Sequence, residues 1–223
     1  MKSYLSALFD LFYPRLCVVC GKSLMKGENL LCSGCLYHFP YSYGEHAELE
    51  LMFREVCDIQ TVYSLFRYNR ESRYRHPIYA LKYHNRRDIG VFMGKMLGEK
   101  IGADKKIDGM IPLPLHPQRE RQRGYNQARQ IALGIAGALG IPIWDGVIFR
   151  KTNNPSQTGL TPEQRVMNVE RIFTLGETET LSGCHVLVVD DVITTGSTLS
   201  SCLCLLNEIP ELRVSVACLA RTD

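Results

Sequence analysis

The most constraining stretch of this chain is His185–Leu199, where a short apolar run leads directly into two carboxylates and a loop rich in hydroxyl groups. Val186–Val189 is an unbroken run of mostly β-branched residues, which is typical of a strand buried on both faces of a parallel sheet. Beyond the loop, apolar residues recur at helical spacing from Leu199 to Leu206. The stretch therefore predicts a strand, a loop and a helix of an open α/β sheet, a fold in which ligands bind beyond the carboxyl ends of the strands.

The loop has the chemistry of an anion site. It consists of small and hydroxylated residues placed where the helix would begin, namely Thr194, Thr195, Gly196, Ser197 and Thr198. Free backbone N–H groups and the helix dipole favour an anion there, and the hydroxyls can donate to phosphate oxygens. The preceding carboxylates, Asp190 and Asp191, would repel phosphate, so we expect them to accept hydrogen bonds from vicinal ribose hydroxyls of the same ligand.

Taken together, these residues resemble the 5-phosphoribosyl-1-pyrophosphate (PRPP) signature of type I phosphoribosyltransferases. The resemblance implies that the acidic pair holds the ribose hydroxyls, that the loop cradles the 5′-phosphate, and that Mg²⁺ binds together with PRPP. Two other interpretations are an ordinary buried strand followed by solvated aspartates, and the Walker B strand of an NTPase. The latter requires a G-x-x-x-x-G-K-[ST] loop, which the chain does not contain.

Four cysteines near the N-terminus form two C-x-x-C pairs, Cys17 with Cys20 and Cys32 with Cys35. Each pair can bind one side of a tetrahedral ion, and four thiolates that leave no open position indicate a structural zinc. Residues 1–60 contain few large apolar side chains, so the metal would supply part of their folding energy. The alternatives are four core or free cysteines, or a redox C-x-x-C motif, which would need a surrounding βαβ pattern.

The chain of 223 residues suits a small N-terminal element and one larger domain. We expect residues 1–60 to hold an amphipathic helix and the Cys₄ site, and residues 61–223 to form the phosphoribosyltransferase-like domain. Residues 61–223 carry 21 basic and 16 acidic residues, a balance that suits an anionic ligand. We expect no membrane span, because no apolar run approaches the ~20 residues required. Nine cysteines without a recognisable signal peptide suggest a reducing compartment, hence the cytoplasm.

A basic and aromatic stretch opens the larger domain, after an expected strand over Thr61–Tyr68. Positions 67 to 87 contain seven basic residues and only one acidic residue, and four tyrosines are interleaved with them. The basic residues are Arg67, Arg70, Arg73, Arg75, Lys82, Arg86 and Arg87. Such a stretch can form a groove for single-stranded nucleic acid, or a solvated helix whose tyrosines pack inward. Helical spacing then predicts a second helix over Ile89–Ile101.

A second possible anion site follows the proline-broken apolar run Met110–Leu115, which fits a strand that ends early. Arginines and a glycine come next, before a helix that runs through Ala138 and ends at Gly140. The stretch P-L-P-L-H-P-Q-R-E-R-Q-R-G-Y-N-Q-A resembles the ComF family of competence proteins, a branch of the phosphoribosyltransferase-like proteins. The Cys₄ element, the Tyr79–Tyr83 stretch and the motif around residues 157–168 resemble the same family.

The ComF resemblance implies roles for several further residues. Arg123, Gly124 and Tyr125 would form the pyrophosphate loop, and residues 150–168 would form a mobile hood over PRPP. The residues of the hood that match the family motif are Gln157, Thr158, Gly159 and Arg165.

Two classes of function follow from this reading. The protein is either a Mg²⁺-dependent phosphoribosyltransferase with an unknown acceptor, in which Asp190, Asp191 and Arg123 carry the chemistry, or a non-catalytic PRPP-binding scaffold. The scaffold would act in uptake of single-stranded DNA during natural transformation, with a competence helicase as a partner. After residue 206 the sequence offers only a loop, a strand over Val214–Leu219 and a short tail, so it identifies no acceptor pocket.

Overall fold

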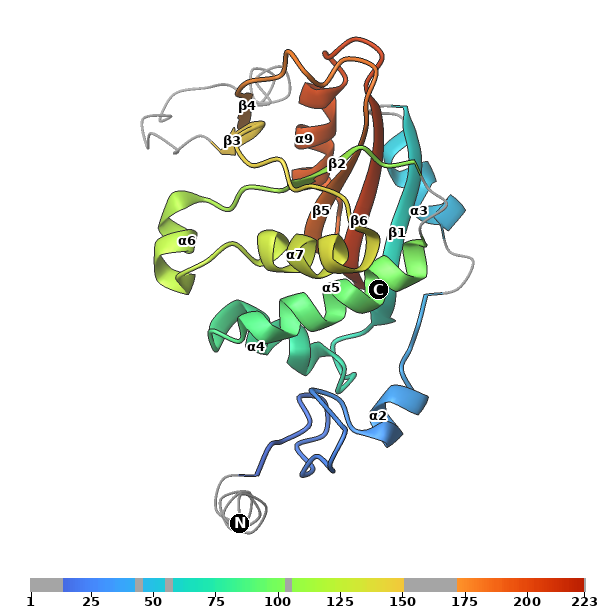
Figure 1. The fold of residues 1–223 in the computed structure, drawn as a ribbon, viewed down its shortest axis with the longest axis vertical. Helices are drawn as coiled ribbons and strands as arrows, with labels where there is room; N and C mark the ends of the chain where they lie inside the picture. Colours follow the sequence, from blue (N-terminus) through green and yellow to red (C-terminus); the bar gives the residue numbers. More distant parts are fainter. Residues whose placement is uncertain (1–13, 43–45, 55–57, 103–105, 151–171, 223) are drawn as a thin grey trace, which may run out of the picture.

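The computed structural model describes residues 14–42, 46–54, 58–102, 106–150 and 172–222. Its centre is a sheet of four parallel strands in the order β1-β6-β5-β2 (Figure 1). The strands are β1 (Ile59–Tyr68), β2 (Gly109–Pro112), β5 (His185–Ile193) and β6 (Arg213–Thr222). The parallel α/β architecture expected from the sequence is therefore confirmed.

The strand β5 lies inside the sheet and is buried on both faces, as its apolar run predicts. Val186 to Val189 are fully buried, and successive side chains point to opposite faces. Leu187 and Val189 belong to one hydrophobic cluster, whereas Val186 and Val188 belong to the other. The strand continues beyond this run to Ile193, because Asp190 still pairs in register with Cys218 of β6. The two aspartates thus lie within the last part of the strand and not after it.

Helices cover both faces of the sheet (Figure 1). One face carries α4 (Arg75–Tyr83), α5 (Arg87–Ile101) and α7 (Gln127–Leu139). The other face carries α9 (Ser197–Leu206) and α3 (His46–Arg54). Helices α5 and α7 approach closely at Gly94, where an added Cβ would lie 2.2 Å from the carbonyl oxygen of Ile131.

The N-terminal element contains the four cysteines and the short helix α2 (Ser33–Tyr37), and it packs against α4 (Figure 1). The Tyr74 hydroxyl donates to the carbonyl oxygens of Cys35 and His38, both at 2.9 Å. The Nδ1 atom of His76 lies 3.1 Å from the Val19 carbonyl oxygen. The cysteine element and the sheet therefore share one hydrophobic cluster.

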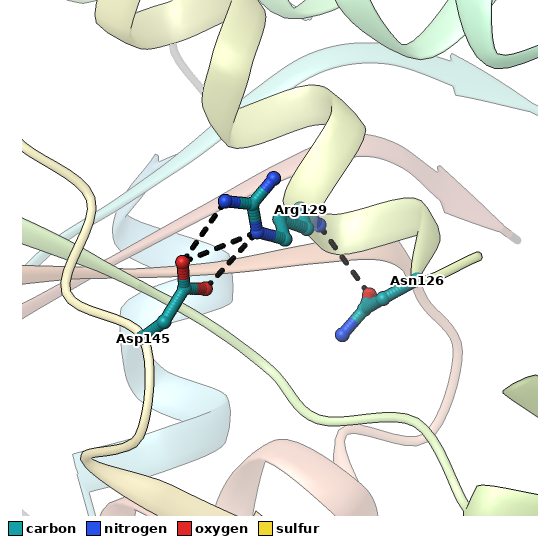
Figure 2. A network of polar contacts seen from close by, with 3 residues as sticks. All are labelled: Asn126, Arg129 and Asp145. Atoms are coloured by element: carbon teal, nitrogen blue, oxygen red, sulfur yellow. Dashed lines mark hydrogen bonds and ion pairs between the residues drawn. The ribbon is translucent and has the colours of Figure 1, made fainter.

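A two-stranded antiparallel sheet, β3 (Ile148–Arg150) with β4 (Phe173–Leu175), brackets the segment expected to form the hood. The expected hood residues 157, 158, 159 and 165 lie outside the described residues, as do residues 1–13 of the expected N-terminal helix. Arg129 of α7 binds Asp145, which precedes β3, through Nε and Nη2 at 3.0–3.2 Å (Figure 2). This exposed ion pair connects the residue before β3 with α7.

Candidate phosphoribosyl pyrophosphate site

A cavity of about 240 Å³ opens at the carboxyl edge of the main sheet, and we call it the acid-pair cavity. It lies where β2 and β5 end, the position expected for a ligand in an open parallel sheet. Its lining comes from α4, α6 (Pro117–Arg123), α7, α9, β3, the end of β5 and the segment that follows β2. The lining residues are Lys82, Leu113, Pro114, Leu115, Arg119, Arg123, Asn126, Gln127, Ala128, Arg150, Asp190, Asp191, Val192, Thr194 and Thr198.

The two aspartates differ in their surroundings. Asp191 forms an ion pair with Lys82 of α4, with 3.0 Å between Oδ1 and Nζ, and both side chains are largely buried. Burial and the neighbouring charge of Asp191 raise the pKa of Asp190 to about 7. A hydrogen bond from the Asp191 N–H and the charges of Lys82 and Arg150 lower this pKa, but their effect is smaller. The pair therefore combines a carboxylate in an ion pair with one whose pKa is raised, and the oxygens of both can accept hydrogen bonds from hydroxyls.

The hydroxyl loop forms the second part of the site. Thr194 to Thr198 line a small hollow of about 40 Å³ at the N-terminus of α9, where the first N–H groups of the helix have no intrahelical acceptor. Gly196 has φ 72°, and an added Cβ would lie 3.0 Å from the buried ring of Phe53 in α3. Helix α3 thus fixes the path of the loop, and only glycine fits both its backbone angle and its contact.

The third part is a group of arginines. Arg119 and Arg123 of α6 line the cavity, and Arg123 donates from Nη1 to Oε1 of Gln127 at 2.8 Å. Gly124 and Tyr125 do not line it among the described residues: Gly124 is the left-handed C-cap of α6, and the buried Tyr125 donates from its hydroxyl to the Leu81 carbonyl oxygen. Of the expected pyrophosphate triplet, the structure therefore brings only Arg123 to the cavity.

Three further lining residues were not predicted from the sequence to bind the ligand, although Arg150 was the first residue of the expected hood. Lys82 was counted with the basic stretch, although the Tyr79–Tyr83 resemblance pointed to its helix. Arg150 reaches the cavity from β3. The pKa of its guanidinium is lowered, because burial and the charge of Arg119 outweigh the opposite effect of Asp190. Asn126 donates from Nδ2 to the Leu113 carbonyl oxygen at 3.0 Å, and its Oδ1 caps α7 (Figure 2). No short-range sequence pattern marks such residues, because tertiary packing brings them together.

The four N-terminal cysteines come together as a candidate metal site. The Sγ atoms of Cys17, Cys20, Cys32 and Cys35 all lie within 4.8 Å of one another, and those of Cys20 and Cys32 are 3.7 Å apart. Zinc with Zn–S bonds of about 2.3 Å in a tetrahedron has sulfur atoms about 3.8 Å apart. Although burial raises it, hydrogen bonds from backbone N–H groups lower the pKa of Cys17 to about 7. The donor set therefore fits a closed thiolate site.

A second hollow, larger than the acid-pair cavity, lies beside it, and we call it the tyrosine cleft. Its volume is about 1010 Å³, and α4 provides much of its wall. The cleft is lined by Tyr68, Arg70, Arg75, His76, Ile78, Tyr79, Lys82, Tyr83, Thr194, Thr195 and Thr222. Three of the seven basic residues of the stretch, and three of its four tyrosines, therefore line one concave surface. Arg73 is exposed and is not among the described residues that line it.

The chain is similar to several known proteins. The phosphoribosyl transferase domain family matches residues 122–222. Competence protein F of Haemophilus influenzae is 29% identical over 233 residues, covering 94% of this chain and 98% of that protein. Competence protein ComFC of Bacillus subtilis is 32% identical over 124 residues, covering 55% and 48%. Among solved structures, the allosteric regulatory enzyme of purine biosynthesis aligns with a TM-score of 0.45 and 21% identity, covering 62% of this chain and 29% of that one.

The parallel sheet, with an acidic pair and a hydroxyl loop at the end of one strand, defines a phosphoribosyltransferase-like protein. Within that class, similarity along nearly the whole chain places it more narrowly: the chain belongs to the ComF family. No helix in the part of the chain that the structure describes has both the length and the apolar character to cross a membrane.

Proposed function

We propose that this protein binds PRPP with Mg²⁺ and transfers its phosphoribosyl group to an acceptor. The observation that carries the proposal is the acid-pair cavity, where two carboxylates, two threonines of the hydroxyl loop and arginines from distant parts of the chain surround one space. The rest of the loop lines the adjoining small hollow. Each chemical group of PRPP has a matching set of residues there.

The hydroxyl loop would bind the 5′-phosphate through backbone N–H groups and side-chain hydroxyls. Asp190 and Asp191 would accept hydrogen bonds from the ribose hydroxyls and so fix the sugar. Arg119 and Arg123 would lie toward the pyrophosphate, as guanidinium groups bind phosphate oxygens in pairs. The three sets together would hold C1 of the sugar in place while the bond to pyrophosphate breaks.

Mg²⁺, bound mostly by the oxygens of PRPP and water, would supply positive charge to the leaving group. The protein's own contribution is to orient the sugar, to neutralise pyrophosphate with arginines, and to exclude water. In the displacement, the acceptor's electron pair forms the new bond to C1, and pyrophosphate leaves with the electrons of the broken C1–O bond. The described residues of the cavity include no histidine to act as general base.

Isothermal titration calorimetry with PRPP and Mg²⁺ tests the proposal directly. We expect Asp191→Asn to weaken binding at least tenfold, because loss of one charged acceptor removes a charge-assisted hydrogen bond to the sugar. Asp145→Asn is the matched control, because Asp145 lies outside the cavity in an exposed ion pair. Ribose 5-phosphate should show the same dependence on Asp191 but bind more weakly. Equal binding of PRPP by wild type and Asp191→Asn, or none by folded wild type, would refute the proposal.

The proposal includes a structural zinc at the Cys₄ site. We expect one zinc per chain by atomic absorption, and less than one in Cys20→Ser. Cys204→Ser is the control, because Cys204 is an exposed cysteine away from the cluster. The structure places no disulfide among the eight cysteines that it describes, and a cytoplasmic location would keep such cysteines reduced.

A second candidate function is handling of single-stranded DNA without catalysis. It is favoured by the tyrosine cleft, where cationic and aromatic side chains meet, and by relatives named for competence and DNA utilization. Such a scaffold would work with a competence helicase. Fluorescence anisotropy with a labelled (dT)₂₀ strand tests it: Arg70→Gln should weaken binding more than Arg73→Gln, and binding should fall steeply with salt. Salt-insensitive binding, or equal effects of the two variants, would exclude the cleft as a DNA site.

A further inference from the structure

The tyrosine cleft presents aromatic surface to a ligand. Tyr79 and Tyr83 lie one turn apart on α4, with ring centroids 4.7 Å apart, and remain 55% and 60% exposed. Tyr68 reaches the cleft from the end of β1. Large exposed aromatic side chains gathered in a hollow of this size suit a planar ring, because aromatic rings stack on one another.

The charges of the cleft select an anion. Arg70, Arg75 and Lys82 line it, and among the residues that the structure describes no aspartate or glutamate does. Arg75 donates from Nη1 to the Arg70 carbonyl oxygen, which holds its guanidinium at the cleft wall. The ring of His76 is fixed through Nδ1 by the N-terminal element. A ligand of this cleft therefore combines a planar ring with a carboxylate or phosphate.

The cleft adjoins the acid-pair cavity. Lys82 and Thr194 line both, and Lys82 is also the ion-pair partner of Asp191. Burial, and then the charge of Asp191, raise the pKa of the Tyr68 phenol, which also lines the cleft. A ligand in the cleft is thus next to the residues proposed to hold the ribose of PRPP.

We infer that the tyrosine cleft is the acceptor site, and that the acceptor is a small planar heteroaromatic ring that carries a carboxylate or phosphate. The inference rests on the proposed function, because it places the second substrate beside C1 of bound PRPP. A ring nitrogen supplies the electron pair for the new bond to C1. Pyrophosphate leaves with the electrons of the broken C1–O bond, and a ring N–H proton passes to solvent water.

A DNA strand matches the stacking and the positive charge of the cleft, but it does not require contact with the acid-pair cavity. An acceptor does require it, since the reacting atoms must approach within about 3–3.5 Å. The shared wall at Lys82 and Thr194 is therefore the observation that favours an acceptor over a strand.

Saturation-transfer NMR with uracil-6-carboxylate and uracil tests the inference, because these probes differ only in the carboxylate. In the presence of Mg²⁺ and PRPP, we expect saturation of the carboxylated ring and at least tenfold weaker binding of uracil. Tyr79→Ala and Arg70→Gln should each weaken the carboxylated probe about tenfold, through loss of stacking and of charge pairing. Arg73→Gln is the matched control, because Arg73 is an exposed arginine outside the cleft.

Phosphorus NMR of PRPP in the same sample distinguishes failure of the proposed function from failure of the acceptor-site inference. If PRPP does not bind, the proposed function fails. If PRPP binds but neither probe does, or if the cleft variants bind like Arg73→Gln, the acceptor site is not this cleft. Binding of a (dT)₁₀ strand that depends on Arg70 and Tyr79, without binding of the carboxylated ring, would likewise overturn the inference and assign the cleft to DNA.

Discussion

Replacing Asp190 with asparagine should stabilise the folded protein and weaken its binding of PRPP. Burial and the charge of Asp191 raise the pKa of Asp190 to about 7 from an ordinary value of 3.8. An ionised carboxylate at this position therefore destabilises the folded state. Asparagine removes that charge and keeps the useful contact, because its Oδ1 can accept the Asp191 N–H that Asp190 accepts at 2.7 Å.

The size of the effect follows from the pKa shift. A rise from 3.8 to about 7 corresponds to an upper limit of about 4 kcal/mol, at about 1.4 kcal/mol for each pKa unit. Burial of the asparagine amide offsets part of this, so we expect a net gain of about 2 kcal/mol. For a chain of this size the gain raises Tm by about 4–8 °C.

The sign of the pH dependence is fixed by the direction of the shift. Because the folded pKa lies above the unfolded one, the folded wild type binds more protons between pH 3.8 and about 7 and loses stability as the pH rises through this window. The asparagine variant has no carboxyl group to ionise at this position, so it does not lose stability in this way. Its advantage should therefore be small near pH 4, grow up to about pH 7, and stay constant above.

Differential scanning calorimetry of ligand-free protein at pH 4.5 and pH 8 measures this directly. Asp191→Asn is the contrasting variant, because it breaks the 3.0 Å ion pair and leaves Lys82 largely buried without its carboxylate. We expect it to lower Tm at pH 8, whereas Asp190→Asn raises it. The explanation from the raised pKa of Asp190 is wrong if the Tm of Asp190→Asn at pH 8 equals or lies below that of the wild type. It is also wrong if the variant gains as much Tm at pH 4.5 as at pH 8. A stable Asp190→Asn protein would also show that its weaker binding of PRPP does not come from unfolding.

Three further predictions concern the scaffold. Gly94→Ala should reduce the free energy of unfolding by about 1–3 kcal/mol in urea, because its Cβ would lie 2.2 Å from a carbonyl oxygen of α7, whereas Gly137→Ala, with nothing within 4 Å, should cause no loss. Tyr74→Phe removes a hydroxyl that donates to two carbonyl oxygens of the cysteine element, so we expect a loss of about 1–2 kcal/mol and faster release of zinc to a chelator; unchanged release would separate that element from α4. Asp145→Ala breaks only the exposed ion pair with Arg129 and should change the free energy of unfolding by less than about 1 kcal/mol, so a larger change would mean that the pair holds the β3–β4 arm in place.

The sequence by itself determined the elements whose signal is local. The buried run Val186–Val189 predicted a strand of a parallel sheet, and the glycine at position 140 predicted the end of α7. Two C-x-x-C pairs predicted a cluster of four sulfurs, and the four atoms do come together. These predictions succeed because hydrophobic period, helix caps and ligand spacing act within a few residues of one another.

Only the tertiary structure decided which residues share a cavity. Lys82 meets Asp191 across 109 positions of sequence, and Arg150 enters from a separate small sheet. The same packing turns Tyr125 into the core, although its neighbour Arg123 lines the cavity. No local pattern encodes such contacts, because they depend on how α4, α6 and β3 are placed around the carboxyl edge of one sheet. The chemistry of the acidic pair and the hydroxyl loop could therefore be predicted from the sequence. The ion pair of Lys82 with Asp191, and the tyrosine cleft next to the cavity, form only in the folded chain.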